Sequence, residues 1–523
     1  MRTFNVEGTC VPDENYMVDI TGKLKQIKTM VDEKKYFTIN RGRQYGKTTT
    51  LFVLEHFLKD DYIVISISFE GLGDESFANS AVFCQAFLKL IWKALRFSGV
   101  SEAYRARWLN ENVKSFDALS DHVTDLCDGH KLILMIDEVD KTTNNRTFLN
   151  FLSKLREKFL ARKVKKDFTF HSVILAGVYD IRNIKLKMIQ EGLYVPTTGE
   201  TTIHNSPWNI AADFEVEMSF SISETETMLM EYEADYKTGM NIFAVATEIY
   251  TYTSGYPVLV SKICKYIDEK LEKDWTPTGV RNAVKLVLKE SGPLFESLIK
   301  NLTSNEEFAR FVYHILMIKT KIPFNINDPL ISLGVRYGYF SDLKNRGVGI
   351  SNKIFEICLT NYFVNQDFRA KMNADTEVPD KEGIIENGKF NMQVCLEKFS
   401  KYYHQQYHQQ DVKFFEHEAR KLFLLFVSAI INGSGFAYME SEQGDKKRTD
   451  VIVNYLTQQF IVELKIWKGK EAHEQAQNQL LGYMDKLSVT EGYLLTFDFR
   501  KKKERRQAWN EFENGQRIFD VRV

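Results

Sequence analysis

The sequence has no long apolar segment. None of its hydrophobic runs approaches the ~18–20 residues that a membrane-spanning helix requires. The first residues, Met-Arg-Thr-Phe-Asn, also lack the apolar core of a secretory signal peptide. These absences argue against an integral membrane protein and predict a cytoplasmic protein that does not act at a membrane.

Cysteine is scarce as well. The six cysteines are scattered over 523 residues, with no Cys-x-x-Cys pair and no histidine nearby at the spacing of a zinc site. This distribution excludes a disulfide framework and a zinc module. It predicts reduced thiols that pack in the interior.

The chain also lacks an excess of either charge. Its formal net charge is −1, so no global field attracts the protein to nucleic acid. Such binding must use local basic patches, and the two candidates are Lys-Lys-Arg at 446–448 and Arg-Lys-Lys-Lys-Glu-Arg-Arg at 500–506. With 44% hydrophobic residues, the chain can bury cores for roughly three domains of ~100–200 residues.

Three charged residues interrupt two strand-like runs near the C-terminal end. Asp450 precedes the β-branched run 451–453, and Glu463 and Lys465 lie in the second run, 460–465. Side chains alternate along a strand, so Glu463 and Lys465 point to one face, and a hairpin can bring Asp450 beside them. The two carboxylates offer oxygen ligands to Mg²⁺ or Mn²⁺, and Lys465 can activate water and stabilise charge at a phosphorus. The residues predict a metal-dependent phosphodiesterase site; a solvated ion pair at a strand edge is the alternative.

This spacing, D-x12-E-x-K, resembles the PD-(D/E)xK nuclease superfamily, with Thr449 in place of the proline. Downstream, Gln479 and Tyr483 match the Q-x-x-x-Y signature of RecB-like members, one turn apart on an expected helix. The resemblance implies that both take part in catalysis.

Members of such families usually supply one more metal-binding Glu from an upstream helix, here Glu416 or Glu418. Residues two apart on a helix diverge, so only one of the two can face the site. Glu416 is slightly favoured because Arg420 lies one turn away.

A second motif lies near the N-terminus. The strand-like run 36–40 leads into Arg-Gly-Arg-Gln-Tyr-Gly-Lys-Thr and then into a helix expected to end at 58. This order is typical of a P-loop, in which backbone N–H groups and the helix N-terminus receive the β-phosphate. Lys47 would reach the β- and γ-phosphates, and the Thr48 hydroxyl would ligate Mg²⁺. The predicted residues of this nucleotide site are Arg41, Gly42, Arg43, Gln44, Tyr45, Gly46, Lys47, Thr48 and Thr49.

The apolar run 131–136 ends in two acids, Asp137 and Glu138, as expected for a buried parallel strand whose tip reaches the nucleotide. Asp137 would hold Mg²⁺ through water, and Glu138 would polarise the attacking water. Further strands are expected at 62–68 and 172–177. They complete a doubly wound parallel sheet.

Together these segments resemble one bacterial family, the AAA-ATPase-like proteins with a C-terminal PD-(D/E)xK nuclease domain. Other matching segments are 16–20, 206–211, Ser-Gly-Tyr-Pro at 254–257 and 352–356. In this family position 41 is commonly Arg, where the general motif has Gly. The resemblance implies ATP and Mg²⁺ as cofactors and places Arg182 where related ATPases sense the γ-phosphate; a surface arginine is the alternative. The resemblance also implies that the Ser-Gly-Tyr-Pro segment lies near the nucleotide. The alternative is that Pro257 is only the first residue of a helix, a position that proline often occupies.

The resemblance and the composition predict an α/β protein in three parts. These are a P-loop AAA-like ATPase domain over 1–271, a helical or winged-helix-type connector with a linker over 272–385, and a restriction-endonuclease-like PD-(D/E)xK domain over 386–523. The leading hypothesis is an ATP-regulated nuclease that cleaves DNA rather than RNA, in phage defence or mobile-element biology, with nucleotide-dependent homo-oligomers as one means of control. The alternatives are a STAND-like signalling switch whose nuclease-like domain targets RNA or only binds nucleic acid, and a scaffold without turnover.

Overall fold

The structure is a computed structural model. It describes residues 2–139, 146–177, 208–318, 320–344, 347–371, 381–406, 416–431, 434–439, 451–456, 458–487, 489–500, 506–513 and 515–523. Across these ranges, no helix combines the length and apolar composition needed to span a lipid bilayer. All six cysteines are free, and four of them are buried, which confirms the prediction of reduced packing residues.

The chain forms two compact units. The first comprises Met1–Ala246, Gly255–Lys262 and Arg336–Gly338. The second comprises Thr247–Ser254, Ile263–Val335 and Tyr339–Val523. The division into three domains at 271 and 385 stays a prediction.

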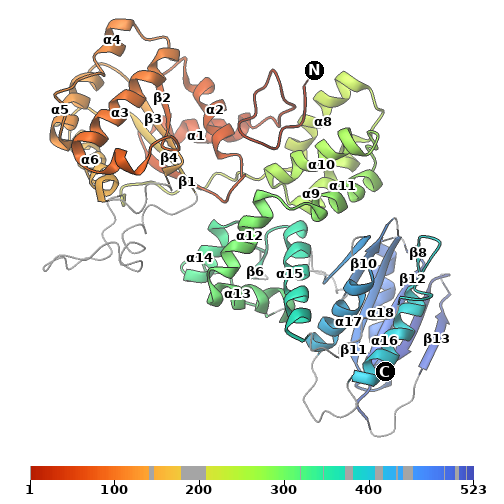
Figure 1. The fold of residues 1–523 in the computed structure, drawn as a ribbon. Helices are drawn as coiled ribbons and strands as arrows, with labels where there is room; N and C mark the ends of the chain where they lie inside the picture. The colour runs from red at the N-terminus through yellow and green to blue at the C-terminus, as the bar shows by residue number, and fades with distance from the viewer. Residues whose placement is uncertain are drawn as a thin grey trace, which may run out of the picture. The chain divides into compact units, whose positions relative to one another are not determined.

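A parallel sheet forms the centre of the first unit (Figure 1). Its strands are β1 Tyr36–Asn40, β2 Ile63–Ser68, β3 Leu132–Asp137 and β4 Ser172–Gly177. They lie in the order β1-β4-β3-β2, and all neighbours are parallel. On the side of β1 away from β4, Ala212 makes one parallel bridge to Phe37. All four strands coincide with predicted ones.

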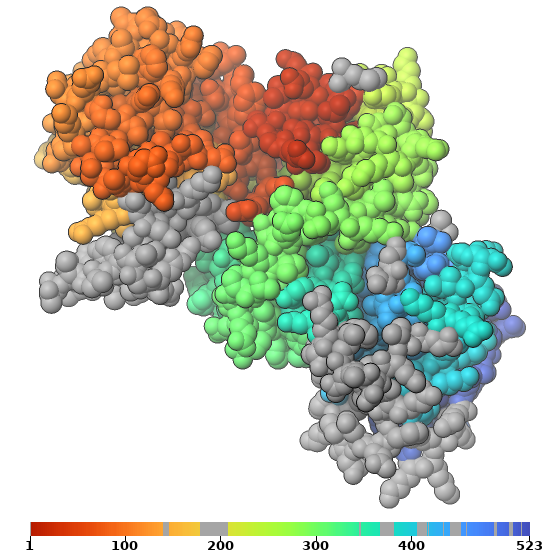
Figure 2. Space-filling model, viewed as in Figure 1, coloured from red at the N-terminus to blue at the C-terminus, as the bar shows by residue number. Residues whose placement is uncertain are grey.

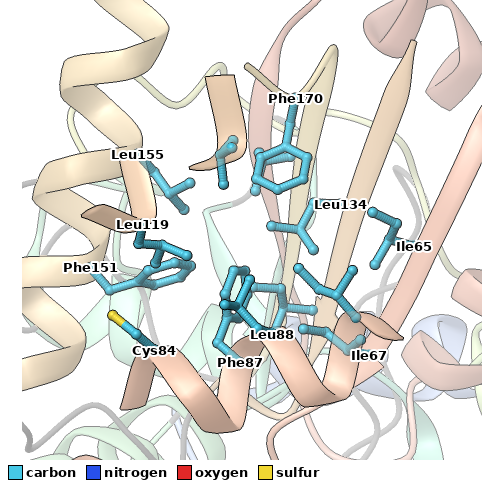
Figure 3. Close-up of a cluster of buried hydrophobic side chains, with 14 of the residues drawn as sticks. Ile65, Ile67, Cys84, Phe87, Leu88, Leu119, Leu134, Phe151, Leu155 and Phe170 are labelled. Atoms are coloured by element: carbon cyan, nitrogen blue, oxygen red, sulfur yellow. The ribbon is translucent and has the colours of Figure 1, made fainter. Parts of the chain in front are cut away.

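Helices cover both faces of this sheet because successive strand residues point to opposite sides. The helices are α1 Thr21–Asp32, α2 Lys47–Leu58, α3 Ser80–Ala94, α4 Glu102–Ala106, α5 Phe116–Cys127 and α6 Arg146–Lys163. Two 3₁₀ turns, Asp74–Phe77 and Leu95–Phe97, flank α3. Ile65 and Leu134 pack with α3, α5 and α6 (Figure 3), whereas Val64 and Ile133 face α1 and α2. The predicted doubly wound α/β fold is confirmed.

The N-terminal arm, residues 2–20, packs against a helical segment that lies far away in the sequence. The helices of this segment are α8 Ile222–Tyr236, α9 Ile242–Thr253 and α10 Pro257–Lys270. Arg2 forms an ion pair with Glu231 at 2.7 Å, and the Tyr16 hydroxyl donates to Asp235 at 2.8 Å. Figure 2 shows the red arm against the yellow-green surface of α8. The arm thus holds α8 beside the ATPase-like core.

The second unit contains helices that precede a mixed sheet. The first elements are α11 Pro277–Lys289, α12 Pro293–Thr303, α13 Glu306–Tyr313, a π-helical turn His314–Ile318, α14 Pro329–Arg336, β5 Phe340–Asp342, β6 Val348–Ile350 and α15 Lys353–Lys371. Strands β5 and β6 form a two-stranded antiparallel sheet between α14 and α15. This combination of helices with one small hairpin matches the predicted winged-helix-type connector.

The mixed sheet has the strand order β13-β14-β12-β11-β10-β9. Its strands are β9 Gly435–Tyr438, β10 Val451–Tyr455, β11 Gln458–Ile466, β12 Glu491–Phe497, β13 Arg506–Glu511 and β14 Arg517–Arg522. The pairs β11–β12 and β12–β14 are parallel, and the other pairs are antiparallel. The remaining elements are β7 Ile385–Glu386, β8 Lys389–Phe390, α16 Met392–Gln406, α17 Glu416–Ile431 and α18 Lys470–Leu487.

Helices α17 and α18 position the predicted nuclease residues. Leu480 of α18 belongs to the same buried cluster as Ile461 and Leu494, so α18 covers the face of the sheet to which those residues point. The helix before the strand pair and the helix after it are found as α17 and α18, but β9 lies between α17 and β10, and β13 and β14 follow β12.

Candidate functional site

The loop between β1 and α2 has the backbone shape of a phosphate-binding loop. Gly46 caps α2 in the left-handed conformation, with φ of 76°, which glycine adopts without a steric penalty. The chain can therefore turn directly from the loop into the helix, and the N–H of Thr50 donates to the carbonyl of Gly46 at 2.8 Å. The first N–H groups of α2 have no partner within the helix, so this terminus favours an anion.

Lys47 is the first residue of α2 and is buried, with 8% of its surface exposed. Its Nζ donates to the carbonyl oxygens of Arg41 at 3.1 Å and Gly42 at 3.0 Å. Anionic phosphate oxygens are stronger acceptors than neutral carbonyls. The ammonium is therefore already held inside the loop, with acceptors that a bound phosphate can replace.

Thr48 and Asp137 meet at the carboxyl edge of the parallel sheet. The Thr48 hydroxyl donates to Asp137 Oδ2 at 2.6 Å, and Asp137 is 7% exposed. A hydroxyl and a carboxylate side by side form an oxygen donor set that suits Mg²⁺. These two residues fit the metal that the sequence predicts for them.

Glu138 follows Asp137 in an unusual backbone conformation. Its φ is 54°, a backbone conformation that costs energy for any residue other than glycine. Its N–H donates to Asp137 Oδ1 at 2.9 Å. Strained backbone of this kind concentrates at functional sites. Arg182, the predicted phosphate sensor, lies outside the described residues.

Two predicted nucleotide-binding residues direct their side chains elsewhere. The guanidinium of Arg41 donates to the carbonyls of Asn40 at 2.9 Å and Val216 at 3.1 Å. The Thr49 hydroxyl accepts from the N–H of Cys10 in the arm at 3.1 Å. Both side chains brace the loop in this structure, and their part in nucleotide binding stays a prediction.

Tyr256, in the Ser-Gly-Tyr-Pro segment, supports the loop from the side of α10. Its hydroxyl donates to the carbonyl of Arg43 at 2.7 Å, and its ring meets that of Tyr45 edge-on at 4.5 Å. Burial raises the pKa of the Tyr256 hydroxyl, which stays a neutral donor. The Tyr45 hydroxyl is 2.5 Å from that of Ser219. The resemblance predicted that the Ser-Gly-Tyr-Pro segment lies near the nucleotide, but it gave the Tyr256 hydroxyl no role of its own.

A second support comes from a distant part of the first unit. A Cβ added to Gly42 would lie 3.2 Å from the carbonyl oxygen of Tyr337, so glycine permits this close approach. Gly338 lies against the ring of Tyr256, since a Cβ there would be 3.5 Å from it. The segment Arg336–Gly338 therefore packs on the loop within the first unit.

An apolar pocket of about 150 Å³ adjoins the loop. Its walls come from the N-terminal arm, the loop, the segment before and within α8 and the start of α10, and they include Met17, Val18, Tyr45, Gly46, Phe220 and Pro257. Pro257 is also the first residue of α10. Pro257 therefore begins a helix and also lies beside the phosphate-binding loop.

Glu463 and Lys465 lie together in the second unit. Lys465 Nζ is 2.8 Å from Glu463 Oε1, and the Glu463 side chain is 1% exposed. Glu416, the first residue of α17, contributes a third charge, with Oε1 3.5 Å from Lys465 Nζ. Arg420 Nη2 is 3.5 Å from Glu416 Oε2, so the arginine one turn away steadies this carboxylate. The two carboxylates offer oxygen ligands that fit a hard divalent cation.

The other predicted nuclease residues have different outcomes. Gln479 and Tyr483 lie on α18, over the sheet face that carries Glu463, and Tyr483 is buried. Of the two alternative glutamates, Glu416 lies 3.5 Å from Lys465. Asp450 lies outside the described residues. Among the residues that the structure describes, no three acidic, histidine or cysteine side chains lie close enough together to hold a metal ion.

Two polar pairs of the same sheet, each with a buried aspartate, escaped the sequence analysis. His473 Nε2 is 2.9 Å from Asp520 Oδ2, and the side chains are 9% and 0% exposed. Asp498, just after β12, binds the Arg500 guanidinium at 2.7 Å, and this hydrogen bond lowers the pKa of the carboxyl group. The available signal was a single acid within or directly after an apolar strand.

Comparisons with known proteins agree with this geometry. A family model described as an AAA-like domain matches residues 15–322, and a model of the PD-(D/E)XK nuclease superfamily matches residues 435–508. No curated protein matches the chain at a significant level.

Solved structures with a similar arrangement include a Walker-type ATPase of Pyrococcus abyssi, with 12% identity, a TM-score of 0.45, and coverage of 68% of this chain and 99% of that one. The ORC2 protein of Aeropyrum pernix, in ADPNP-ADP complexes, has 12% identity, a TM-score of 0.34, and coverage of 70% and 98%. Its ADP form has 14% identity, a TM-score of 0.34, and coverage of 70% and 97%.

The family matches bear out the two modules that the motifs predict. Both modules belong to hydrolase classes, an ATPase and a nuclease. Because the first match spans more than half of the chain, the protein belongs to the AAA-like domain family, and it carries a C-terminal domain of the PD-(D/E)XK nuclease superfamily.

Proposed function

We propose that this protein is a nuclease that cuts DNA with the help of a divalent metal and is controlled by ATP bound at its P-loop. The observation that carries the proposal is the coexistence of two sites in one chain. One joins Lys47, Thr48 and Asp137, and the other joins Glu463, Lys465 and Glu416.

ATP fits the first site because the loop can bind its phosphates and the adjoining pocket can hold its purine ring. The loop and the N-terminus of α2 offer N–H groups and the Lys47 ammonium to the phosphates. The adjoining apolar pocket, with Tyr45 and Phe220 in its walls, suits a purine ring. Mg²⁺ held by Thr48 and Asp137 would neutralise phosphate charge, and Glu138 would orient the attacking water.

The second site suits phosphodiester hydrolysis. Glu463 is buried beside Lys465, which neutralises it and keeps the ammonium within reach of a bound phosphate. A divalent cation held by Glu463, Asp450 and Glu416 would supply a low-pKa water as nucleophile. Lys465 would then orient this water, while Gln479 and Tyr483 would contact the substrate or support the metal ligands.

Control by nucleotide is supported by the segment Arg336–Gly338. It packs on Gly42 and Tyr256 in the first unit, while its neighbours in sequence, Val335 and Tyr339, belong to the second unit. A movement of the loop on phosphate binding would therefore act on a segment that is covalently continuous with the second unit. Such coupling typically amounts to ~1–3 kcal/mol.

The proposal is tested by cleavage assays with the full chain on matched DNA and RNA, with Mg²⁺ or Mn²⁺, with EDTA, and with and without ATP. The expected result is metal-dependent cleavage of DNA whose rate changes with ATP. Cleavage of RNA alone would favour a signalling switch with an RNA target, and binding without cleavage would favour a scaffold. A role in defence against phage or in mobile-element biology remains part of the proposal.

A further inference from the structure

Trp467 lies on the same face of the second sheet as the proposed nuclease residues. The parallel ladder continues past β11, because the N–H of Trp467 donates to the carbonyl of Phe497 at 2.9 Å. Since side chains alternate along a strand, Glu463, Lys465 and Trp467 point to one side. At about 3.3 Å per residue, the Cα atoms of Trp467 and Lys465 are roughly 7 Å apart.

Two guanidinium groups lie beside the partly exposed Trp467 ring. The Arg522 guanidinium carbon is 3.7 Å from the ring centroid, and that of Arg500 is 4.8 Å away. Arg500 is anchored by the buried Asp498, yet its side chain is 49% exposed. The adjacent Phe499, also an aromatic residue, is 47% exposed. Arg500, Arg522 and, at 5.2 Å between ring centroids, His473 therefore surround the Trp467 ring next to the face that carries Glu463 and Lys465.

This combination is the one that proteins use to bind single-stranded nucleic acid. Aromatic rings stack on bases, and arginines contact the phosphates and add a cation–π attraction. The formal net charge of the chain is −1, so binding depends on such a local group rather than on the field of the whole protein. The basic run 500–506 begins in this group.

We propose that Trp467, with Phe499 and Arg500, binds an unpaired nucleotide next to the scissile phosphate. This inference rests on the proposed nuclease function and specifies its substrate as DNA with a single-stranded segment. Bases inside a duplex stack on their neighbours and cannot offer a face to Trp467. The Arg522 guanidinium supports the ring and strengthens its interaction with the base.

The test measures binding rather than cleavage. Full-length protein in EDTA is titrated into fluorescently labelled oligo(dT), which cannot pair with itself, and into a mixed-sequence DNA duplex. Trp467→Ala should weaken oligo(dT) binding by on the order of 5- to 150-fold, the effect of losing one stacked base. Duplex binding should not change, nor should the salt dependence of oligo(dT) binding, because no charge is removed.

Trp509 provides a matched control. It is also partly exposed and has an arginine, Arg517, 4.4 Å from its ring centroid. However, Trp509 lies on the opposite face of the sheet from Glu463. It pairs with Phe519, Phe519 pairs with Tyr493, and Tyr493 pairs with Val462, the residue before Glu463 in β11. Trp509→Ala should bind oligo(dT) like the wild type.

Trp467→Phe provides a second test in case the alanine variant does not fold. It should fold, retain part of the affinity, and lose the quenching of tryptophan fluorescence that oligo(dT) causes in the wild type. The inference is overturned if wild-type protein does not bind oligo(dT), if both Trp467 variants behave like the wild type, or if Trp467→Ala weakens duplex binding equally. A lower salt dependence in Trp467→Ala would also overturn it, because Trp467 would then serve only to hold the arginines.

The inference and the proposed function fail separately. Wild-type protein that binds oligo(dT) through Trp467 but cuts no DNA contradicts the nuclease proposal alone. Protein that cuts DNA with unchanged binding in the Trp467 variants contradicts only the inference. Oligo(rU) in a parallel titration shows whether the site accepts RNA; weaker binding than oligo(dT) is expected, and a clear preference for oligo(rU) would contradict the DNA assignment.

Discussion

The Thr48 hydroxyl donates a hydrogen bond of 2.6 Å to the Asp137 carboxylate. This contact joins the N-terminus of α2 to the tip of β3 across the intervening strand β4. Thr48 and Asp137 are the residues that would hold Mg²⁺, which would add positive charge beside the phosphates. The fold of the sheet therefore brings these two residues together.

Replacing Lys47 should remove most of the ATP affinity. Lys47→Ala deletes the ammonium that the loop carbonyls hold in place. Hydrogen bonds to charged groups contribute about 1.5–3 kcal/mol each, so we expect a loss of roughly 10- to 100-fold or more. Isothermal calorimetry measures it, with the exposed Lys59→Ala at the other end of α2 as the control. Equal affinities for wild type and Lys47→Ala would remove the P-loop assignment.

Binding and hydrolysis should separate at Glu138. Glu138→Gln keeps the size of the side chain but removes the carboxylate that would polarise water. The variant should retain ATP affinity and hydrolyse ATP on the order of 10²–10⁴-fold more slowly, the usual effect of losing a general base. Phosphate release assays measure the rate. Unchanged turnover would assign this role to another residue.

The nuclease site should depend on three residues and on metal. Asp450→Ala and Glu463→Ala should lose a metal ligand, whereas Lys465→Ala should still bind metal but fail to activate water. Each variant should cut at least ~10²-fold more slowly than the wild type, and EDTA should abolish cleavage. Gel assays measure the rates, and thermal unfolding checks the fold. Full activity in all three variants would reduce this segment to an ordinary strand pair.

Glu416 and Glu418 form a matched pair within this test. They lie two residues apart on one helix, where side chains diverge, and Glu416 Oε1 is 3.5 Å from Lys465 Nζ. Glu416→Gln should therefore impair cleavage, whereas Glu418→Gln should leave it close to the wild-type rate. The reverse result would show that the helix presents its other face to the metal.

Stability should fall at acidic pH partly because of His171. Burial lowers the pKa of His171 from 6.5 to about 4, with help from the positive charges of Lys34, Arg162 and Lys131. The folded protein therefore binds this proton less tightly than the unfolded chain. The contribution of His171 is complete above about pH 6.5 and is lost as the pH falls towards 4 and below. Urea unfolding of wild type and His171→Gln over this range should show the smaller loss in the variant, and the exposed His56→Gln controls for loss of a histidine. Equal losses in wild type and His171→Gln would contradict this assignment.

The elements that follow simple periodicity could be predicted from the sequence. The run 132–136 is apolar throughout because β3 is buried on both faces, and Asp137, which ends the strand, lies at the carboxyl edge of the sheet. The alternation at Glu463 and Lys465 likewise predicted one shared face, and the two side chains are in contact. The choice between Glu416 and Glu418 was open in sequence, and the contact of Glu416 with Lys465 now favours the former.

Contacts between residues distant in sequence could not be predicted in this way. Tyr256 and Tyr337 approach the P-loop from positions more than two hundred residues downstream. The Ser-Gly-Tyr-Pro motif predicted that Tyr256 lies nearby but not that its hydroxyl binds the loop, and Tyr337 belongs to no motif. The side chain of Arg41 was assigned to nucleotide, yet it donates to the carbonyls of Asn40 and Val216. A sequence motif specifies which residues surround a ligand, whereas side-chain direction depends on neighbours that only the fold supplies.

The central claim is that nucleotide at the P-loop controls the nuclease, and a cleavage assay under three nucleotide conditions tests it most directly. The rate of DNA cleavage is measured with no nucleotide, with ADP and with ATP, for wild type and Lys47→Ala, with sedimentation run in parallel. We expect ATP to change the rate or the oligomeric state of the wild type by roughly 5- to 150-fold, and Lys47→Ala to lose this response while it keeps its basal cleavage. Identical rates and sedimentation profiles under all three conditions would contradict the account and leave two independent activities in one chain.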